Sequence, residues 1–289
     1  DGVVHYKIPV EISGSTINDR DVTITIAIDP DTLRLYNEAM YFRRTDLYYR
    51  QLGQEHYSFP NGMSVTVPAG KNVGLIDVDF RINNLDLVEK YILPLTISET
   101  SQYMPSPKKH YKKSLMRIIP FNEFSGQYSA NAGMIRGQVG NSDPTPSTSM
   151  ATREMRVVNH NTVFFYAGLT VEDARDRALY KVRATFVPSA TTADSGFVTL
   201  AADSAKINFQ YTPAKCTYVI EKEMDPNQPY LQIRTITMNL HYQYEDVTNP
   251  GYVVTYKFGG TRATDPGSYT LERRRNTQIP EEDQQEIFE

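Results

Sequence analysis

Residues 64–80 read SVTVPAGKNVGLIDVDF and decide how the first part of the chain is organised. Apolar and polar residues alternate on both sides of the break Pro68–Lys71, which is typical of two antiparallel strands joined by a short turn. Asp77 and Asp79 share one parity of the second strand and are expected to face water. The opposite parity is expected to face a core and holds Ile76, Val78 and Phe80. This predicted hairpin requires a second sheet to cover its apolar side.

The neighbouring segments are able to supply that second sheet. Further strands are predicted from their alternation at Val4–Ser13, Asp21–Ile28, Tyr91–Ile97 and Leu115–Ile119. Asp29 is placed to cap a helix that begins at Pro30, and a second helical turn is predicted from Thr45. We therefore predict an all-β first domain, an immunoglobulin-like sandwich over residues 1–119.

A different pattern begins after Pro120, which we take as the domain boundary. The predicted strands are Arg153–Val158, Thr162–Tyr166, Ala178–Val187, Gly196–Leu200, Lys206–Phe209, Thr217–Lys222, Gln232–Tyr244, Tyr252–Phe258 and Tyr269–Arg273. One short helix is predicted at Val171–Ala178. Many strands at regular spacing with little helix predict a closed or nearly closed antiparallel β-barrel over residues 120–275. Residues 276–289 then form an acidic C-terminal tail.

Composition excludes several classes of partner and of covalent architecture. The formal net charge of the 289 residues is only −4, which is a poor match to a nucleic-acid backbone, so no nucleic-acid partner is expected. Cys216 is the single cysteine and cannot form an internal disulfide. No apolar run approaches the roughly 18–20 residues of a membrane span. Because the sequence starts at Asp1 without a methionine, we expect a processed or truncated product.

No local arrangement of residues predicts catalysis, a cofactor or a metal site. The histidines lack metal-ligand spacing; they are His5, His56, His110, His160 and His241. A metal site assembled from distant residues stays open. Serine-nucleophile and phosphate-loop motifs are missing. Asp77 and Asp79 are a carboxylate pair that glycoside hydrolysis could use, but a solvated strand face explains them better. The basic cluster KKHYKK at 108–113 is either a site for acidic groups or a solvated loop at a sheet edge.

Aromatic residues are the feature that most favours ligand binding. The chain has 20 Tyr and 12 Phe but no Trp, and tyrosine rings can stack on sugars while their hydroxyls stay hydrated. Tyr48 and Tyr49 are adjacent on a short helical segment, where burying both is difficult, so they are the candidate glycan-binding residues. In the strand Gln232–Tyr244, one parity, with Tyr242 and Tyr244, is predicted to be core. The polar parity, with His241 and Gln243, either faces solvent or lines a cavity.

The order of the motifs in residues 5–119 resembles a known family. VTITIAIDP, VTVPAGK and KYILPLTI follow one another as in the N-terminal domain (DUF1735) of surface lipoproteins from gut Bacteroidetes. The second part, which opens with FSGQYSA and is rich in Tyr, is similar to the lipocalin-like barrel (DUF4361) that often follows it. The same N-terminal domain resembles the leading module of chitinase-like endoglycosidases, but this chain lacks their DxxDxDxE run.

The resemblance implies a non-catalytic, cell-surface glycan-binding lipoprotein of polysaccharide utilisation. Its partner would be a polysaccharide or oligosaccharide, and an outer-membrane receptor complex is a further candidate partner. The only membrane contact expected is a lipid anchor on a cysteine upstream of residue 1, at the outer membrane. The alternative is a structural or adhesin-type protein-interaction module at the same location. An exposed row of aromatic rings favours the first reading, and a broad apolar patch favours the second.

Overall fold

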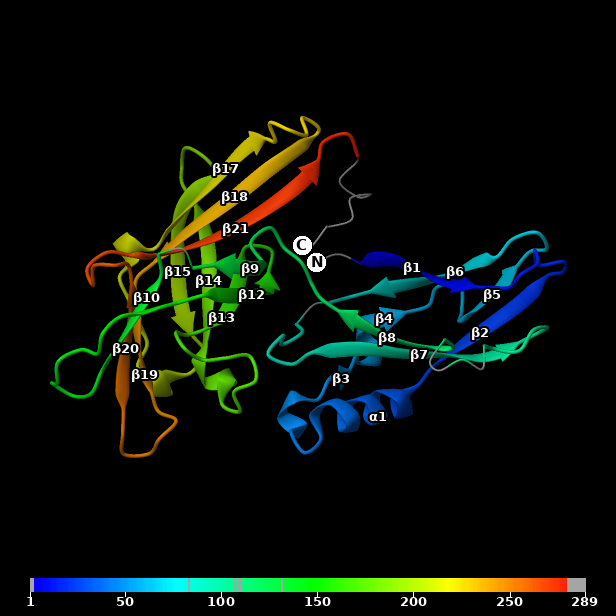
Figure 1. Ribbon diagram of the computed structural model, residues 1–289, viewed down its shortest axis with the longest axis horizontal. Helices are drawn as coiled ribbons and strands as arrows, with labels where there is room; N and C mark the ends of the chain where they lie inside the picture. The colour runs from blue at the N-terminus through cyan, green and yellow to red at the C-terminus, as the bar shows by residue number, and fades with distance from the viewer. Residues whose placement is uncertain (1–2, 83, 107, 109–110, 131, 280–289) are drawn as a thin grey trace. The chain divides into compact units, whose positions relative to one another are not determined.

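The computed structural model describes residues 3–82, 84–106, 108, 111–130 and 132–279 (Figure 1). The chain divides into two compact units, Asp1–Pro120 and Phe121–Glu289. Most of the predicted acidic tail, residues 280–289, lies outside the described residues, as do Lys109 and His110 of the basic cluster. Within the described part, no helix is both long and apolar enough to cross a membrane.

In its described residues, the first unit is built from short and medium strands and one α-helix. Its elements are β1 (Val4–Glu11), β2 (Val22–Ile28), α1 (Pro30–Tyr41), β3 (Arg50–Gln51), β4 (Tyr57–Ser58), β5 (Ser64–Val67), β6 (Val73–Phe80), β7 (Tyr91–Thr100) and β8 (Lys113–Ile118). The predicted helical turn from Thr45 is present as a 3₁₀ turn over Thr45–Leu47.

These strands form the two sheets of the predicted sandwich. One sheet has the order β1-β6-β4, and the other contains β5, β2 and β7 in that order. In this second sheet β8 pairs antiparallel with β7, and the short strand β3 pairs parallel with the first residues of β7. Alternate residues of both sheets bury a common core, as Val22, Ile24 and Ile26 do on β2. Ile76, Val78 and Phe80 are buried on β6, as predicted. The immunoglobulin-like sandwich is confirmed.

The predicted hairpin over residues 64–80 is wrong in one respect. β5 pairs with β2, whereas β6 pairs with β1, so the two strands lie in opposite sheets. Alternation identified the buried face of each strand, but it holds no information about which neighbour accepts its backbone hydrogen bonds. At Gly74 the two sheets approach so closely that a Cβ atom would lie 2.9 Å from the side chains of Val65 and Val67. Residues 64–80 therefore form a sheet-to-sheet corner.

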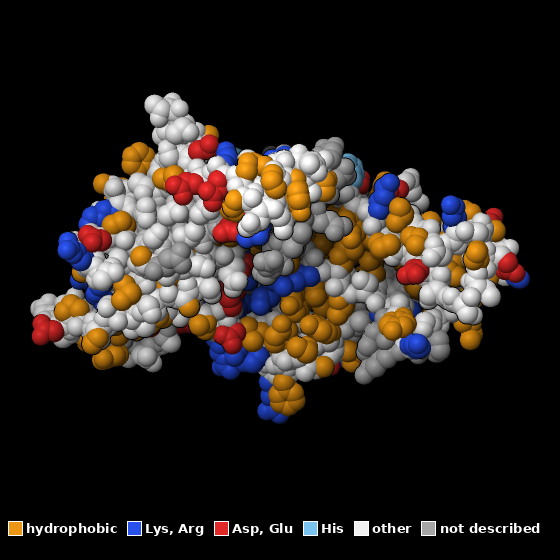
Figure 2. Space-filling view, turned by 45° about the horizontal axis from the view of Figure 1, so that its top comes forward, with side chains coloured by type: hydrophobic (Ala, Val, Ile, Leu, Met, Phe, Trp, Pro, Cys, Tyr) orange, Lys and Arg blue, Asp and Glu red, His pale blue; other side chains and the backbone are white. Residues whose placement is uncertain are grey.

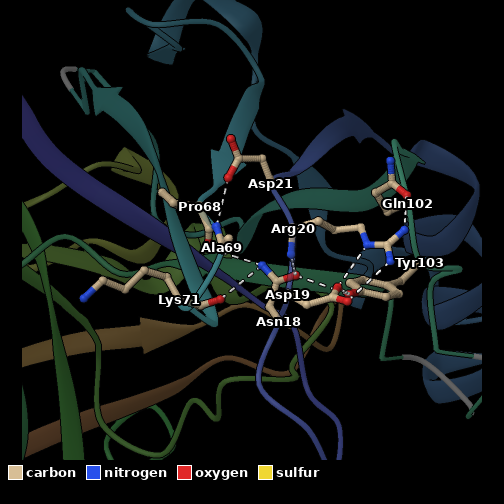
Figure 3. A network of polar contacts seen from close by, with 9 residues as sticks. All are labelled: Asn18, Asp19, Arg20, Asp21, Pro68, Ala69, Lys71, Gln102 and Tyr103. Carbon is tan, nitrogen blue, oxygen red and sulfur yellow. Dashed lines mark hydrogen bonds and ion pairs between the residues drawn. The ribbon is translucent and has the colours of Figure 1, made fainter.

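A polar network holds this corner in place (Figure 3). Asn18 donates side-chain hydrogen bonds to the carbonyls of Pro68 and Lys71, each 3.3 Å long. The backbone N–H of Ala69 donates to Asp21 Oδ1 at 2.9 Å. These bonds satisfy turn groups that the strand ladders cannot reach, because the chain is changing sheets there. The loop before β2 thus fixes the course of the β5–β6 connection.

Helix α1 begins as the sequence predicts. Asp29 Oδ1 accepts a hydrogen bond from the Thr32 backbone N–H at 3.1 Å, and Pro30 occupies the first helical turn. Lys113 of the basic cluster reaches the same cap, with its Nζ 3.0 Å from Asp29 Oδ2. One lysine of KKHYKK therefore has a structural partner at the helix start.

Thirteen strands lie in the described residues of the second unit. They are β9 (Gly126–Ser129), β10 (Met134–Gln138), β11 (Thr148–Ser149), β12 (Thr152–Asn159), β13 (Thr162–Tyr166), β14 (Lys181–Pro188), β15 (Ser195–Ala202), β16 (Gln210–Tyr211), β17 (Thr217–Met224), β18 (Leu231–Leu240), β19 (Tyr242–Asp246), β20 (Val254–Gly259) and β21 (Gly267–Asn276). Short 3₁₀ turns lie at Arg177–Tyr180, Ala205–Ile207 and Pro213–Lys215.

Eight of these strands close into the predicted antiparallel barrel, in the order β12-β13-β14-β15-β17-β18-β21-β9. The remaining five form a second sheet, β11-β10-β20-β19-β16, which the sequence did not predict. Figure 1 shows β10, β19 and β20 of this sheet beside the barrel strands. One core joins the two, because Tyr242 and Phe258 of the second sheet are buried together with barrel residues such as Met238 and Tyr269. The second unit is therefore a barrel with an attached sheet.

Three local predictions fail for reasons of pairing. The predicted strand Gln232–Tyr244 breaks at His241, because its first part pairs within the barrel and its second part with β16 and β20. Lys206–Phe209 falls largely in a 3₁₀ turn rather than a strand. Val171–Ala178 forms turns that lead into the 3₁₀ segment Arg177–Tyr180, not a helix. Short segments such as these follow their tertiary surroundings more than their own propensity.

Candidate functional site

The second sheet carries a shallow hollow of about 270 Å³ on the face turned away from the core. This hollow is lined by Arg136, Gln138, Pro144, Gln210, Tyr211, Thr212, His241, Tyr242, Gln243, Lys257, Phe258, Gly259 and Ala263. Its volume is close to the lower end of the roughly 300–1,000 Å³ of small-molecule sites. The hollow can therefore hold part of an extended ligand rather than enclose a whole one.

Strand alternation explains why a set of polar side chains lines the hollow. On β10, β19 and β20, one parity points into the core and includes Ile135, Tyr242 and Phe258, which are buried. The other parity carries the polar side chains that line the hollow. The sheet thus presents an apolar face to the barrel and a polar face to the outside.

Register brings four of these polar residues into one row across four strands. Arg136 of β10 lies opposite Lys257 of β20, Lys257 lies opposite Gln243 of β19, and Gln243 lies opposite Gln210 of β16. Residues directly opposite one another on antiparallel strands have Cβ atoms about 4.5–5.5 Å apart. We call Arg136, Lys257, Gln243 and Gln210 the polar row.

Hydrogen bonds fix the side chains of the polar row. Lys257 Nζ donates to Gln138 Oε1 at 3.0 Å, and Gln243 Nε2 donates to Gln210 Oε1 at 3.0 Å. The Arg136 guanidinium donates to the carbonyl of Gly260 at 3.2 Å and to that of Thr261 at 2.6 Å. Each of these bonds leaves donors or acceptors of the same side chain available to a ligand.

His241 closes one side of the hollow, at the point where β18 continues into β19. Its Nδ1 lies 3.0 Å from Thr212 Oγ1, and its Nε2 lies 3.0 Å from the carbonyl oxygen of Ala263. A neutral ring with its proton on Nε2 satisfies both contacts, because it donates to the carbonyl and accepts from the hydroxyl. The imidazole is therefore held by the protein as a wall of the hollow.

Buried tyrosines form a rigid layer beneath the polar row. Burial raises the pKa of the Tyr242 and Tyr244 hydroxyls, so both stay neutral at physiological pH. Tyr242 Oη accepts a hydrogen bond from the Gly168 backbone N–H at 3.1 Å, and the Tyr242 ring stacks on Phe258 with centroids 5.0 Å apart. The prediction that these two tyrosines belong to the core is confirmed.

The structure places the predicted residues Tyr48 and Tyr49 elsewhere, after α1 in the first unit. Both side chains are half-buried. The Tyr49 ring packs against Tyr36 and Tyr41, with centroids 5.9 Å apart in each case, and Tyr48 Oη donates to the Phe42 carbonyl at 2.6 Å. Burial, followed by the nearby Tyr49 hydroxyl, raises the pKa of Tyr41 to about 12. These rings form a tyrosine cluster rather than an exposed flat row.

Exposed apolar side chains surround this cluster. Phe42 is 74% exposed and Met40 is 60% exposed. Figure 2 shows hydrophobic side chains gathered beside lysine and arginine side chains at the bottom of the view, where Figure 1 places the C-terminal end of α1. The Arg43 guanidinium lies 5.6 Å from the centre of the Phe42 ring.

The other candidates from the sequence have partners within the protein. Asp79 Oδ1 lies 2.7 Å from His5 Nδ1, and Asp77 Oδ2 accepts from Asn61 Nδ2 at 2.8 Å. Neither aspartate lines the hollow. Among the residues that the structure describes, no group of three or more His, Cys, Asp or Glu side chains is arranged to hold a metal ion.

The sequence singled out only part of this site. It left His241 and Gln243 open as solvent-facing or cavity-lining, and the structure places both in the hollow. Arg136, Lys257 and Gln210 were not identified, because the row exists only after three separate strand pairings have formed. The Gln138 and Lys257 side chains, for example, come from positions 119 residues apart.

Family models match both parts of the chain. Residues 1–101 match the domain of unknown function DUF4973, rather than the DUF1735 model that the motifs suggested, and residues 112–262 match a model for a C-terminal domain. A solved structure described as a multidomain protein including DUF1735, from Bacteroides ovatus, is nevertheless 33% identical. The alignment with that structure covers 99% of this chain and 91% of that chain, with a TM-score of 0.84. The likeness to DUF4361 stays a prediction.

Two further solved structures are similar over nearly the whole length. A Bacteroides ovatus protein of unknown function is 34% identical, with 99% of this chain and 92% of that chain covered and a TM-score of 0.84. An auxiliary nutrient binding protein from Bacteroides thetaiotaomicron is 34% identical, with 98% of this chain and 87% of that chain covered and a TM-score of 0.84. No curated protein matches the sequence. The chain belongs to the family of these solved Bacteroides structures, and its own sequence matches DUF4973 followed by the C-terminal domain model.

Proposed function

We propose that this protein binds a saccharide without cleaving it, and that the polar row forms the binding surface. The observation that carries the proposal is the alignment of Arg136, Lys257, Gln243 and Gln210 across a hollow with a rigid aromatic floor. The likeness to an auxiliary nutrient binding protein of Bacteroides thetaiotaomicron supports a binding role.

The chemistry of the row suits saccharide hydroxyls. A hydroxyl both donates and accepts, and the amides of Gln243 and Gln210 offer both functions side by side. Tyr211 also lines the hollow, and its half-buried side chain lies opposite Tyr242 and packs against the core. An open site of this kind excludes little water, so we expect dissociation constants in the micromolar to millimolar range.

The composition of the lining supports binding rather than hydrolysis. Glycoside hydrolysis ordinarily uses two carboxyl groups on either side of the scissile bond. The residues that line the hollow include no aspartate or glutamate. Asp77 and Asp79, the pair noted in the sequence, are in the other unit and are engaged with Asn61 and His5.

Calorimetry with a panel of host and plant oligosaccharides tests the proposal. Gln243→Ala and Gln210→Ala should each weaken binding about two- to tenfold, because each removes a hydrogen bond worth about 0.5–1.5 kcal/mol. Gln127→Ala, at an exposed position on β9, is the matched control and should bind as the unsubstituted protein does. Unchanged affinity in both variants would show that the polar row is not the binding surface. The absence of a heat signal with every saccharide would contradict the proposed function itself.

The tyrosine cluster after α1 is a second candidate surface for the same ligand. Tyr48 and Tyr49 are only half-buried, and their neighbours Met40 and Phe42 are largely exposed. Tyr48→Ala should weaken saccharide binding about two- to tenfold if the cluster contributes stacking, since such contacts are worth about 0.5–1.5 kcal/mol. Tyr49→Ala removes the ring between Tyr36 and Tyr41, so its melting temperature must be measured beside its affinity.

We further propose that the protein acts at the cell surface, held at the outer membrane by a lipid on a cysteine upstream of residue 1. Metabolic labelling of the full-length protein with a fatty-acid analogue, followed by protease shaving of intact cells, tests both points. The alternative role, as a structural or adhesin-type module bound to an outer-membrane receptor, is favoured by the exposed apolar residues Leu35, Met40 and Phe42. Retention of a receptor in a pull-down that Phe42→Ser abolishes would support this alternative.

A further inference from the structure

Arg136 and Lys257 are two like charges held directly opposite each other on paired strands. Such pairs are destabilising in a sheet, because the side chains share one face at about 4.5–5.5 Å between Cβ atoms. The Arg136 side chain cannot easily turn away, since its guanidinium donates to the carbonyls of Gly260 and Thr261. The fold therefore keeps two cations together on an open surface.

Neither cation has an acidic partner among the described residues. The polar contact of Lys257 is the neutral amide of Gln138, and those of Arg136 are backbone carbonyls. Other cations of the same unit do have carboxylate partners. The pairs include Lys222 with Asp194 at 2.7 Å and Arg156 with Glu172 at 2.7 Å.

The nearest acidic residue along β19 does not neutralise the pair. Glu245 lies two residues beyond Gln243, and its Oε1 accepts from Asn208 Nδ2 at 2.8 Å. The residues that line the hollow include neither Glu245 nor any other aspartate or glutamate. The hollow consequently combines hydrogen-bonding amides with an unneutralised positive charge.

We propose that the Arg136–Lys257 pair binds the carboxylate or sulfate group of an acidic saccharide, while Gln243 and Gln210 bind the neighbouring hydroxyls. This inference rests on the proposed saccharide-binding function and names its ligand class. Guanidinium and ammonium groups form short, charge-assisted hydrogen bonds with such anions, and both retain unused N–H donors here. The whole chain has a net charge of −4, so the anion is recognised by contact and not by long-range attraction.

The test compares acidic and neutral members of matched pairs on the full chain by calorimetry. The first pair is an oligogalacturonide and its carboxyl-reduced, neutral counterpart; the second is a sulfated galactan oligosaccharide and its desulfated counterpart. We expect at least one acidic member to bind about tenfold more tightly than its neutral counterpart. The preference should shrink when the salt concentration is raised from 50 to 500 mM, because salt screens contacts with exposed charges. The screening length falls from about 14 Å to about 4 Å over this range.

Substitutions identify the residues that cause the preference for the acidic member of each pair. Lys257→Gln should abolish most of this preference, so that the acidic member then binds about as tightly as its neutral counterpart. Arg136→Lys keeps the charge and should retain the preference, which separates charge recognition from any loss of the carbonyl contacts made by Arg136. Lys222→Gln, which removes a cation already paired with Asp194, is the control and should change nothing.

The outcomes separate this inference from the proposed function. Equal binding of acidic and neutral members, with loss of both in Gln243→Ala, would overturn the ligand class and support the saccharide site. A preference for acidic members that Lys257→Gln leaves intact would overturn the role of the cation pair. Failure of every saccharide to bind would overturn both.

Discussion

The outer face of β6 and the outer face of the β10–β20–β19–β16 sheet both carry charged side chains, yet they differ in how these charges are arranged. On β6, Asp79 is paired with His5 and Asp77 with Asn61. On the second sheet, Arg136 and Lys257 face each other with neutral partners only. A polar strand face becomes a candidate site when like charges face each other across paired strands and the surface around them is hollowed.

The largest expected effect is in the core beneath β6. Val78→Asp places an unpaired charge at a position that is fully buried in the sandwich, so we expect a loss of about 4 kcal/mol or more in the free energy of unfolding of the first unit. Urea denaturation measures it. Thr66→Asp, at an exposed position of β5, is the matched control and should cost less than about 1 kcal/mol. Similar losses in the two variants would show that the faces have been assigned wrongly.

The next effect concerns binding and contrasts the two faces directly. Lys257→Glu places a carboxylate opposite Arg136, so the two side chains can pair and the cation that remains is neutralised. Affinity for an acidic oligosaccharide should fall more than tenfold, measured by calorimetry. Asp77→Lys makes a charge change of the same size on β6 and should leave that affinity unchanged. A rise of comparable size in Asp77→Lys, whose charge change has the opposite sign, would indicate a general electrostatic effect and not a site.

Sequence alternation was sufficient for the faces of the strands but not for their neighbours. It identified Ile76, Val78 and Phe80 as core, and it assigned Tyr242 and Tyr244 to the core correctly. It failed where two strands adjacent in sequence join different sheets, as at the Pro68–Lys71 turn. Side-chain periodicity depends on the geometry within one strand, whereas pairing depends on contacts that are distant in sequence.

The candidate site was harder to predict than the fold for the same reason. The strands that carry it are short, and β16 has only two residues, Gln210–Tyr211. Each residue of the polar row is unremarkable in its own segment, so no motif marks it. His241 and Gln243 gave the one usable signal, because they are polar residues on a strand whose opposite face is strongly apolar.

A smaller effect is expected from acid, at the cap of α1. Burial by itself would raise the pKa of Asp29, but the hydrogen bonds from Thr32 and Lys113 outweigh it and hold the pKa below the usual value. A carboxylate with a depressed pKa stabilises the fold above its unfolded-state pKa of about 3.9, and that stabilisation is lost as the pH falls through the lower folded-state pKa.

The first unit should therefore lose up to about 1 kcal/mol, the usual worth of an N-cap, as the pH falls below about 4. Thermal melts from pH 6 to pH 3 measure this loss. Asp29→Asn keeps a capping side chain but cannot titrate, so its melting temperature should depend less on pH over this interval. An unchanged pH dependence in Asp29→Asn would assign the acid sensitivity to other carboxylates, with the paired Asp79 as the next residue to substitute.

The smallest expected effect is a change in the stability of the second unit, and it tests the same comparison. If Arg136 and Lys257 repel each other in the free protein, Lys257→Gln should stabilise the second unit by about 0.2–0.5 kcal/mol at low salt, because a like-charged cross-strand pair is removed. The gain should disappear at high salt, where exposed charges are screened. On β6, Asp79→Asn weakens the hydrogen bond with His5 and removes no like-charged cross-strand pair, so it should not stabilise the first unit. Paired chemical denaturations at about 0.02 and 0.5 M salt resolve the sign. A loss of stability in Lys257→Gln at low salt would mean that the contact with Gln138 outweighs the repulsion, and the cation pair would then be a structural feature of the sheet.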